Sequence, residues 1–197
     1  MVKTDKLWIN GNIYRNEEAD DLIESFSKSV SIAGKDYQHL RLLTEETMGM
    51  AHQLLKNFEG ELWIEGTPSG YDIILEAAVG ENRNQTVDPA DTKAGFMPKI
   101  AELLNCSYIF ESREEVPEAL AAALPDYLSY GFSCSEDSGK SWAGKWSLSA
   151  YRQNLKSQPG TEPVLDELEK SIVAQLADEV TVGISGRRVR LVISVRF

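Results

Sequence analysis

The sequence lacks several features that define whole classes of protein. No apolar run approaches the length of a membrane-spanning helix, and the first residues contain no apolar core like that of a signal peptide. There are only two cysteines, Cys106 and Cys134, so we expect no disulfide framework, and a reducing cytoplasm is the simplest setting. Basic residues are also scarce, 20 against 31 acidic ones, which gives a net charge of −11. This balance argues against a nucleic acid or an anionic membrane surface as the main partner.

Motifs for phosphate binding, nucleophilic catalysis and metal binding are missing as well. The chain has no Walker A loop, no Gly-x-Gly-x-x-Gly after a strand and no Gly-x-Ser-x-Gly nucleophile elbow. The two histidines, His39 and His52, have no further ligand at metal spacing, so we expect no metal site and solvent-facing or locally bonded imidazoles. Nucleophilic catalysis therefore has no positive support in the sequence.

What is present is clear periodicity toward both ends of the chain. Apolar residues three and four apart predict helices, and alternating apolar residues joined by turn residues predict hairpins. The predicted elements are an opening strand or hairpin over 6–14, helices over 16–33 and 36–57, a hairpin over 61–79, a helical stripe over 165–176 and a hairpin over 180–197.

This order of elements predicts the fold class. Helices in blocks and strands paired by hairpins favour an α+β fold, a two-layer sandwich whose mainly antiparallel sheet has its helices on one face. The length of 197 residues suits a single domain over 1–197, with an insertion at 81–160. Three aromatic residues of the insertion, Trp142, Trp146 and Tyr151, have two open interpretations, because they suit either a protein interface or the closing of the core over the sheet.

Two adjacent glutamates in the second predicted helix are the candidates for function. Glu45 follows Arg41 by four residues, which predicts a surface ion pair. Glu46 lies at the margin of the apolar stripe, four residues before Met50. Its carboxylate either faces a cleft and acts as a general base, or it stays in water while its methylene groups pack against neighbours.

The helix at residues 40–50, with the sequence LRLLTEETMGM, resembles the N-box helix of the GHKL ATPase superfamily, which includes histidine kinases and anti-sigma-factor serine kinases. Residues 172–182 and the closing hairpin are similar to the last helix and strands of the anti-sigma kinases. The resemblance covers residues 1–80 and 162–197. It implies a histidine-kinase-like ATPase fold in a bacterial regulatory protein, in which residues 81–160 replace the nucleotide lid.

The sequence departs from the family at the magnesium site. The family's N-box glutamate is followed four residues later by an asparagine that holds the ion. Here Met50 stands four residues after Glu46, and Gly49 stands four residues after Glu45. Neither offers the side-chain oxygen that a hard cation needs.

The adenine and phosphate elements differ too. The family's Asp-x-Gly-x-Gly box follows the second hairpin strand, but here residues 75–80 at the end of that strand, which include Ala78 and Gly80, contain one glycine and no aspartate. Glu167 and Glu169 stand where the family has phosphate-cradling glycines, so a triphosphate would meet negative charge.

The resemblance and its departures together imply a non-enzymatic regulatory or protein-interaction module with a degenerate ATP-binding site. This hypothesis expects no cofactor and a protein partner, and it allows the chain to form a homo-oligomer. The alternative is an active ATP-binding anti-sigma-type serine kinase or ATPase with a diverged pocket, ATP with Mg²⁺ as cofactor and Glu46 as base. A third hypothesis is a different small ligand in the vacated cleft. That cleft is expected near Glu46, Met50, Ala78, Gly80, Glu167 and Glu169.

Overall fold

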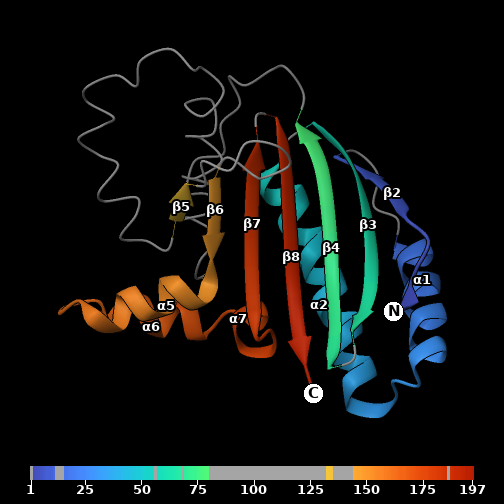
Figure 1. The fold of residues 1–197 in the computed structure, drawn as a ribbon, viewed down its shortest axis with the longest axis horizontal. Coiled ribbons are helices and arrows are strands. Elements are labelled where there is room, and N and C mark those ends of the chain that lie inside the picture. The colour runs from blue at the N-terminus through green and yellow to red at the C-terminus, as the bar shows by residue number, and fades with distance from the viewer. Residues whose placement is uncertain are drawn as a thin grey trace.

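One layer of the described part of the chain is an antiparallel sheet of eight strands (Figure 1). The strands are β1 (Val2–Lys3), β2 (Leu7–Asn10), β3 (Phe58–Thr67), β4 (Gly70–Val79), β5 (Phe132–Cys134), β6 (Gly144–Ser147), β7 (Glu179–Ser185) and β8 (Arg188–Arg196). Their order is β1-β3-β4-β8-β7-β6-β5, and β2 pairs with β3 as well. The computed structural model describes residues 2–11, 16–55, 57–67, 69–79, 132–134, 144–185 and 187–197.

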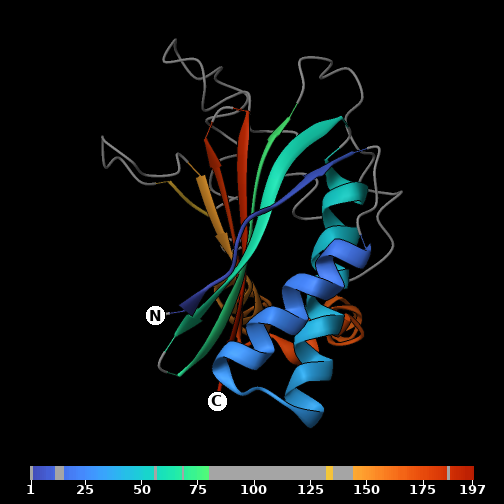
Figure 2. The ribbon, with the colours of Figure 1, turned by 90° about the vertical axis from the view of Figure 1, so that its right-hand side faces the viewer.

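The second layer is made of helices. The described helices are α1 (Asn16–Val30), α2 (Gly34–Leu54), α5 (Leu148–Ser157), α6 (Glu162–Glu169) and α7 (Ile172–Leu176). Figure 2 shows α1 and α2 together on one side of the sheet. α7 contacts α2, and α5 contacts β6 and β7. The described chain therefore has the predicted α+β fold, a two-layer sandwich with an antiparallel sheet.

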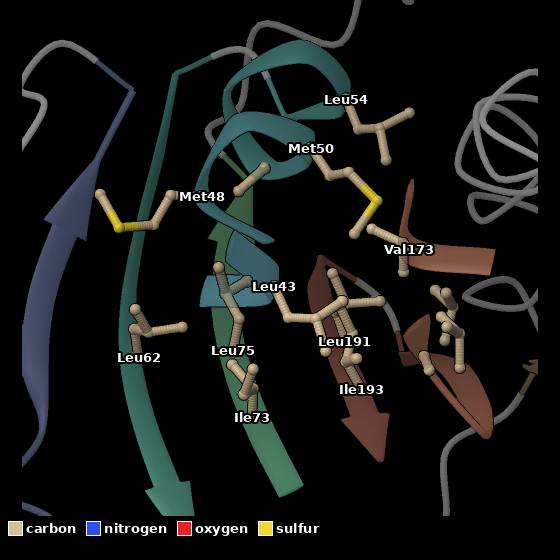
Figure 3. Close-up of a cluster of buried hydrophobic side chains, with 14 of the residues drawn as sticks. Leu43, Met48, Met50, Leu54, Leu62, Ile73, Leu75, Val173, Leu191 and Ile193 are labelled. Atoms are coloured by element: carbon tan, nitrogen blue, oxygen red, sulfur yellow. The ribbon is translucent and has the colours of Figure 1, made fainter. Parts of the chain in front are cut away.

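The core lies between α2 and the central strands. The predicted apolar stripe of α2 turns Leu43 and Met50 inward, with exposed fractions of 0% and 5%. They meet Leu75 of β4, Leu191 of β8 and Val173 of α7 in one cluster (Figure 3). Helical spacing of three and four residues keeps these side chains on one face of α2, so the helix buries that face along its length.

Two threonines are buried on the same face of α2 without leaving their hydroxyl groups unpaired. Thr44 donates to the carbonyl oxygen of Leu40 at 2.8 Å, and Thr47 donates to that of Leu43 at 2.6 Å. Both threonines have an exposed fraction of 0%. Because each hydroxyl bonds to its own helix, the polar groups can lie in the core at little cost.

The β3–β4 hairpin shows how the two faces of the sheet differ. Leu62 and Ile64 of β3 face the helices, and Trp63 between them faces the opposite side, as the alternation predicts. Leu62 lies opposite Leu75 of β4, so the inward residues of the two strands form one apolar surface. We call the side without α1 and α2 the open face of the sheet.

Gly34 and Gly60 follow the first two predicted helices in the sequence, but neither glycine ends a helix in the structure. α1 ends at Val30 rather than at Gly34, and Ser31 takes the left-handed conformation after it, with φ 59°. Gly34, with φ 62°, is the first residue of α2. Gly60 lies inside β3, where a Cβ atom would be 2.5 Å from the carbonyl oxygen of Glu76. Glycine is therefore required at position 60 because β3 and β4 approach closely there, and not because a helix ends there.

The apolar stripe over 165–176 forms two helices instead of the one that the periodicity predicts. α6 ends at Glu169, and Ser171 takes an extended conformation and accepts a hydrogen bond from the backbone N–H of Ala174 at 3.4 Å. Ser171 thus caps α7 and starts a new helix. Leu168 and Val173 are buried on either side of the break, so the apolar pattern continues through it.

Residues 144–157 contribute β6 and α5 to the sandwich. They belong to the 81–160 stretch, and the sequence patterns assigned no element to them. β6 pairs with β7 and sets Trp146 opposite Val182. Trp146 and Tyr151 have exposed fractions of 2% and 1%, and their ring centroids are 5.8 Å apart. These two aromatics close the core, which was the second interpretation. Trp142 lies outside the described residues, as do Gly80, Cys106 and most of the 81–160 stretch.

Candidate functional site

Met50 of α2, at which the GHKL resemblance would require a magnesium-holding asparagine, belongs to the core. Met50 is 5% exposed and belongs to the same buried cluster as Leu54 and Val173. Figure 3 shows its side chain on the part of α2 that faces Val173 of α7. Apolar atoms therefore surround this position, and a thioether sulfur is a poor ligand for a hard cation such as Mg²⁺.

The two candidate glutamates lie next to this position on α2. Glu45 is exposed and accepts a hydrogen bond from Arg41 Nε at 3.0 Å, which confirms the predicted ion pair. Arg41 also donates to Asp20 of α1 at 3.2 Å and so links the two helices. Glu46 is half-buried and has no hydrogen bond or ion pair within the described residues.

The remaining residues of the expected cleft are spread over different parts of the molecule. Ala78 is exposed on the open face, paired in register with Glu59 and Arg188, so it lies across the sheet from Glu46 and Met50. Gly80 lies outside the described residues. Glu167 and Glu169 are exposed on α6, and Glu167 forms an ion pair with Lys170 at 2.5 Å. Ala78 is thus kept apart from the two α2 residues by the sheet itself.

The open face is built around a buried tryptophan. Trp63 is only 3% exposed although no described helix covers it. Lys3 Nζ and Lys6 Nζ each lie 4.8 Å from its ring centroid, and Arg190 Cζ lies 5.9 Å away. The indole Nε1 donates to Glu65 at 2.8 Å. Cationic side chains therefore shield the ring through their methylene stems and cation–π contacts.

Ion pairs between neighbouring strands extend this cover across the open face. Lys3 pairs with Glu65 at 2.8 Å, Arg190 pairs with Glu76 at 3.1 Å, and Arg196 pairs with Asp72 at 2.8 Å. Lys6 also pairs with Glu61. The hydrogen bond from the Lys3 ammonium is the main reason that the pKa of Glu65 lies below its usual value. Such cross-strand pairs allow one face of an antiparallel sheet to meet water.

A hollow of about 350 Å³ lies at one end of the open face, and we call it the Trp8 groove. The strand register sets Trp8 opposite Glu61, Glu61 opposite Glu76 and Glu76 opposite Arg190. The groove is lined by Trp8, Glu59, Glu61, Glu76, Ala78 and Arg188, among others. It thus places an exposed aromatic ring, carboxylates and a guanidinium group around a floor of small residues.

None of the carboxylates of the Trp8 groove was predicted as a site residue from the sequence. Alternation within each strand was a usable signal, since it puts Glu59 and Glu61 on the face opposite Leu62. It does not tell which strands are neighbours. The pairing of β4 with β8, which brings Arg188 beside Ala78, joins segments more than a hundred residues apart in the chain.

One of the two histidines is held in a semi-buried site at the end of α2. The ring of His52 packs edge-on against Phe58, with centroids 5.4 Å apart. Burial lowers the pKa of His52 below its usual value, and a hydrogen bond to the backbone of Gly11 opposes this shift. His52 is therefore locally bonded, one of the two forms expected from the sequence.

The described residues were also compared with the requirements of a metal site and of a membrane-spanning helix. Within them, no three histidine, cysteine or carboxylate side chains converge in a way that would hold a metal ion. Among the described helices, none combines the length and the apolar character needed to cross a bilayer.

Comparisons of the chain with protein-family models, with curated proteins and with solved structures gave no significant match.

Proposed function

We propose that this chain is a non-enzymatic regulatory or protein-interaction module, built on a histidine-kinase-like ATPase fold that has lost its nucleotide chemistry. The order of elements supports this proposal: strands, two helices and a hairpin stand at the start of the described chain, and a short helix and a hairpin stand at its end. One observation carries the proposal: Met50, which stands where that family holds magnesium, is buried among apolar side chains. We further propose a cytoplasmic location, since the chain has two cysteines and no disulfide framework.

Two further observations support the loss of nucleotide binding. The GHKL resemblance would require an adenine-binding aspartate just after β4. Ala78, near the end of this strand, lies on the open face and not beside α2. Glu167 and Glu169 add exposed negative charge where the resemblance would require phosphate-cradling glycines. A phosphate group is stabilised by backbone N–H groups and cations, and carboxylates repel it.

The loss of nucleotide binding is tested by titration calorimetry and by thermal unfolding. A non-hydrolysable ATP analogue with Mg²⁺ is expected to give no binding heat and no shift of the unfolding temperature. The alternative, an active serine kinase or ATPase with Glu46 as base, predicts saturable binding and hydrolysis that Glu46→Gln abolishes. Glu45→Gln, one residue away in the Arg41 ion pair, is the matched control. Binding together with Glu46-dependent hydrolysis overturns the proposal.

The test for the interaction role uses the chain in its own cell. Chemical crosslinking before purification is expected to join the chain to one protein partner in a fixed ratio. Failure to find a partner, combined with measurable ATP hydrolysis, assigns the chain to the enzymatic alternative.

A further inference from the structure

The open face of the sheet has two unlike regions. Around Trp63, each carboxylate discussed above is paired with a lysine or arginine, and the ring itself is 3% exposed. The side chain of Trp8 is more accessible to solvent. Trp8 is 42% exposed, although tryptophan is among the largest apolar side chains. The sheet therefore shields one tryptophan fully and presents the other to the surroundings.

The charges of the Trp8 groove differ from one side to the other. Glu59 is exposed and has no hydrogen bond or ion pair within the described residues. Glu61 and Glu76 already have cationic partners in Lys6 and Arg190. Among the described carboxylates of the groove, Glu59 is thus the one that has no ion-pair partner there.

Opposite this carboxylate lies a guanidinium group. Arg188 and Glu59 are the register partners of Ala78 on its two sides, so one small residue separates them on the open face. A guanidinium group has five N–H donors, which leaves donors for a further acceptor beyond any bond it makes within the chain. The groove therefore combines a cation-binding side with a donor side.

We propose that the Trp8 groove binds an arginine or lysine side chain in an extended segment of a protein partner. The cationic group would lie against the Trp8 indole and pair with Glu59, while Arg188 donates to a carbonyl oxygen of the partner's backbone. This inference rests on the proposed function and names the chemistry of the partner. The net charge of −11 adds long-range attraction for a basic segment.

The peptide character follows from the two sides of the groove taken together. A polyamine satisfies Glu59 and Trp8 but offers no acceptor to Arg188. A peptide carries a cationic side chain and backbone carbonyl oxygens in one molecule, so it can reach both Glu59 and Arg188, which lie on the two strands that flank Ala78.

The experiment is a nuclear magnetic resonance titration of the ¹⁵N-labelled chain with the peptide acetyl-Gly-Arg-Gly-Arg-Gly-amide. We expect saturable shifts of the Trp8 indole N–H and of the backbone amides around Glu59 and Ala78. Trp8→Ala and Glu59→Gln are each expected to raise the Kd about threefold, the size of an exposed cation–π contact or ion pair. Glu24→Gln, which changes an exposed carboxylate on α1 in the other layer, is expected to leave the Kd unchanged.

Spermine and the charge-reversed peptide acetyl-Gly-Glu-Gly-Glu-Gly-amide complete the titration. The proposal requires that both bind more weakly than the arginine peptide. It also requires that Arg188→Gln raise the Kd of the arginine peptide but not the Kd of spermine. Equal binding of spermine, equal loss in Glu24→Gln, or no shifts at the groove overturns it. These outcomes leave the ATP titration untouched, so failure of the groove is distinguishable from failure of the interaction module.

Discussion

The carboxylate of Glu179, the first residue of β7, accepts a hydrogen bond from the backbone N–H of Ser149 in the first turn of α5 at 3.1 Å. It also accepts hydrogen bonds from the side chains of Ser147 and Ser149 and from the N–H of Val180 at 2.9 Å. Free N–H groups and the positive end of the helix dipole favour a carboxylate at this place. Glu179 therefore links the first turn of α5 to the start of β7.

Replacement of this carboxylate is expected to destabilise the fold. Glu179→Ala leaves the first turn of α5 without its acceptor and should lower the free energy of unfolding by about 1–2 kcal/mol. Glu179→Gln keeps one acceptor oxygen and should lose less. Urea denaturation followed by circular dichroism measures both. Ser147 also caps α5, because its hydroxyl oxygen accepts a hydrogen bond from the backbone N–H of Ala150 at 3.4 Å. Equal stability of Glu179→Ala and the parent chain would show that Ser147 alone suffices as the cap.

Two glycines provide a matched pair of opposite sign. Gly49 lies inside α2, where no described atom is within 4 Å of an added Cβ, so Gly49→Ala should stabilise the chain by about 0.5–1 kcal/mol. Gly60 lies in β3 with the Glu76 carbonyl oxygen 2.5 Å from an added Cβ. Gly60→Ala should therefore destabilise the chain by about 1–3 kcal/mol. Thermal unfolding of both variants tests the contrast, which fails if the two shifts have the same sign.

The hydroxyl group of Tyr71 is buried and has no hydrogen-bond partner among the described residues. Its ring packs edge-on against Phe26 and Phe197, with centroids 6.3 and 6.0 Å away. Tyr71→Phe keeps these contacts and removes the unpaired group, so stability should stay the same or rise by up to about 1 kcal/mol. Tyr71→Ala, which empties the site, should cost about 3–5 kcal/mol. A loss above about 1 kcal/mol in Tyr71→Phe, measured by urea denaturation, would reveal a partner for the hydroxyl.

The buried site of His52 predicts a dependence of stability on pH. Burial lowers the pKa of His52 in the folded chain, so the unfolded chain binds the proton more tightly. The resulting stability is present above the unfolded pKa of about 6.5 and is lost as the pH falls toward the folded value. The free energy of unfolding, measured from about pH 7.5 down to about pH 5.5, should therefore decrease.

Replacement of His52 gives the control for this dependence. His52→Gln removes the titrating group, so the curve of stability against pH should be flatter than in the parent chain. His39→Gln, which removes the other histidine of the same helix, is the matched control for the loss of an imidazole. A slope that is the same in His52→Gln and the parent chain would assign the dependence to other groups.

Much of the fold was predictable because it depends on neighbours in the sequence. Spacings of three and four residues placed Leu40, Leu43 and Met50 on the buried face of α2, and alternation placed Trp63 opposite Leu62. The Arg41–Glu45 ion pair followed in the same way from a separation of four residues. Local geometry is the same in any helix or strand, so these features need no knowledge of the rest of the molecule.

Other features were not predictable because they depend on contacts between distant segments. The break before α7 is made by the side chain of Ser171, inside an apolar stripe that continues on both sides. The role of Gly60 depends on the close approach of Glu76 in the neighbouring strand. The place of β6 at the side of β7 depends on the pairing of Trp146 with Val182. Periodicity contains no information on any of these contacts.

The sequence by itself determined the α+β class, the apolar faces of the helices and strands, and the absence of an oxygen ligand at Met50. Each is a property of residue type and of local spacing. Only the tertiary structure decided that Ala78 lies across the sheet from Met50, and that Trp8, Glu59 and Arg188 line one groove. The physical reason is that strand neighbours and register are set by packing of the whole sheet on the helices, which brings together residues that no local pattern connects.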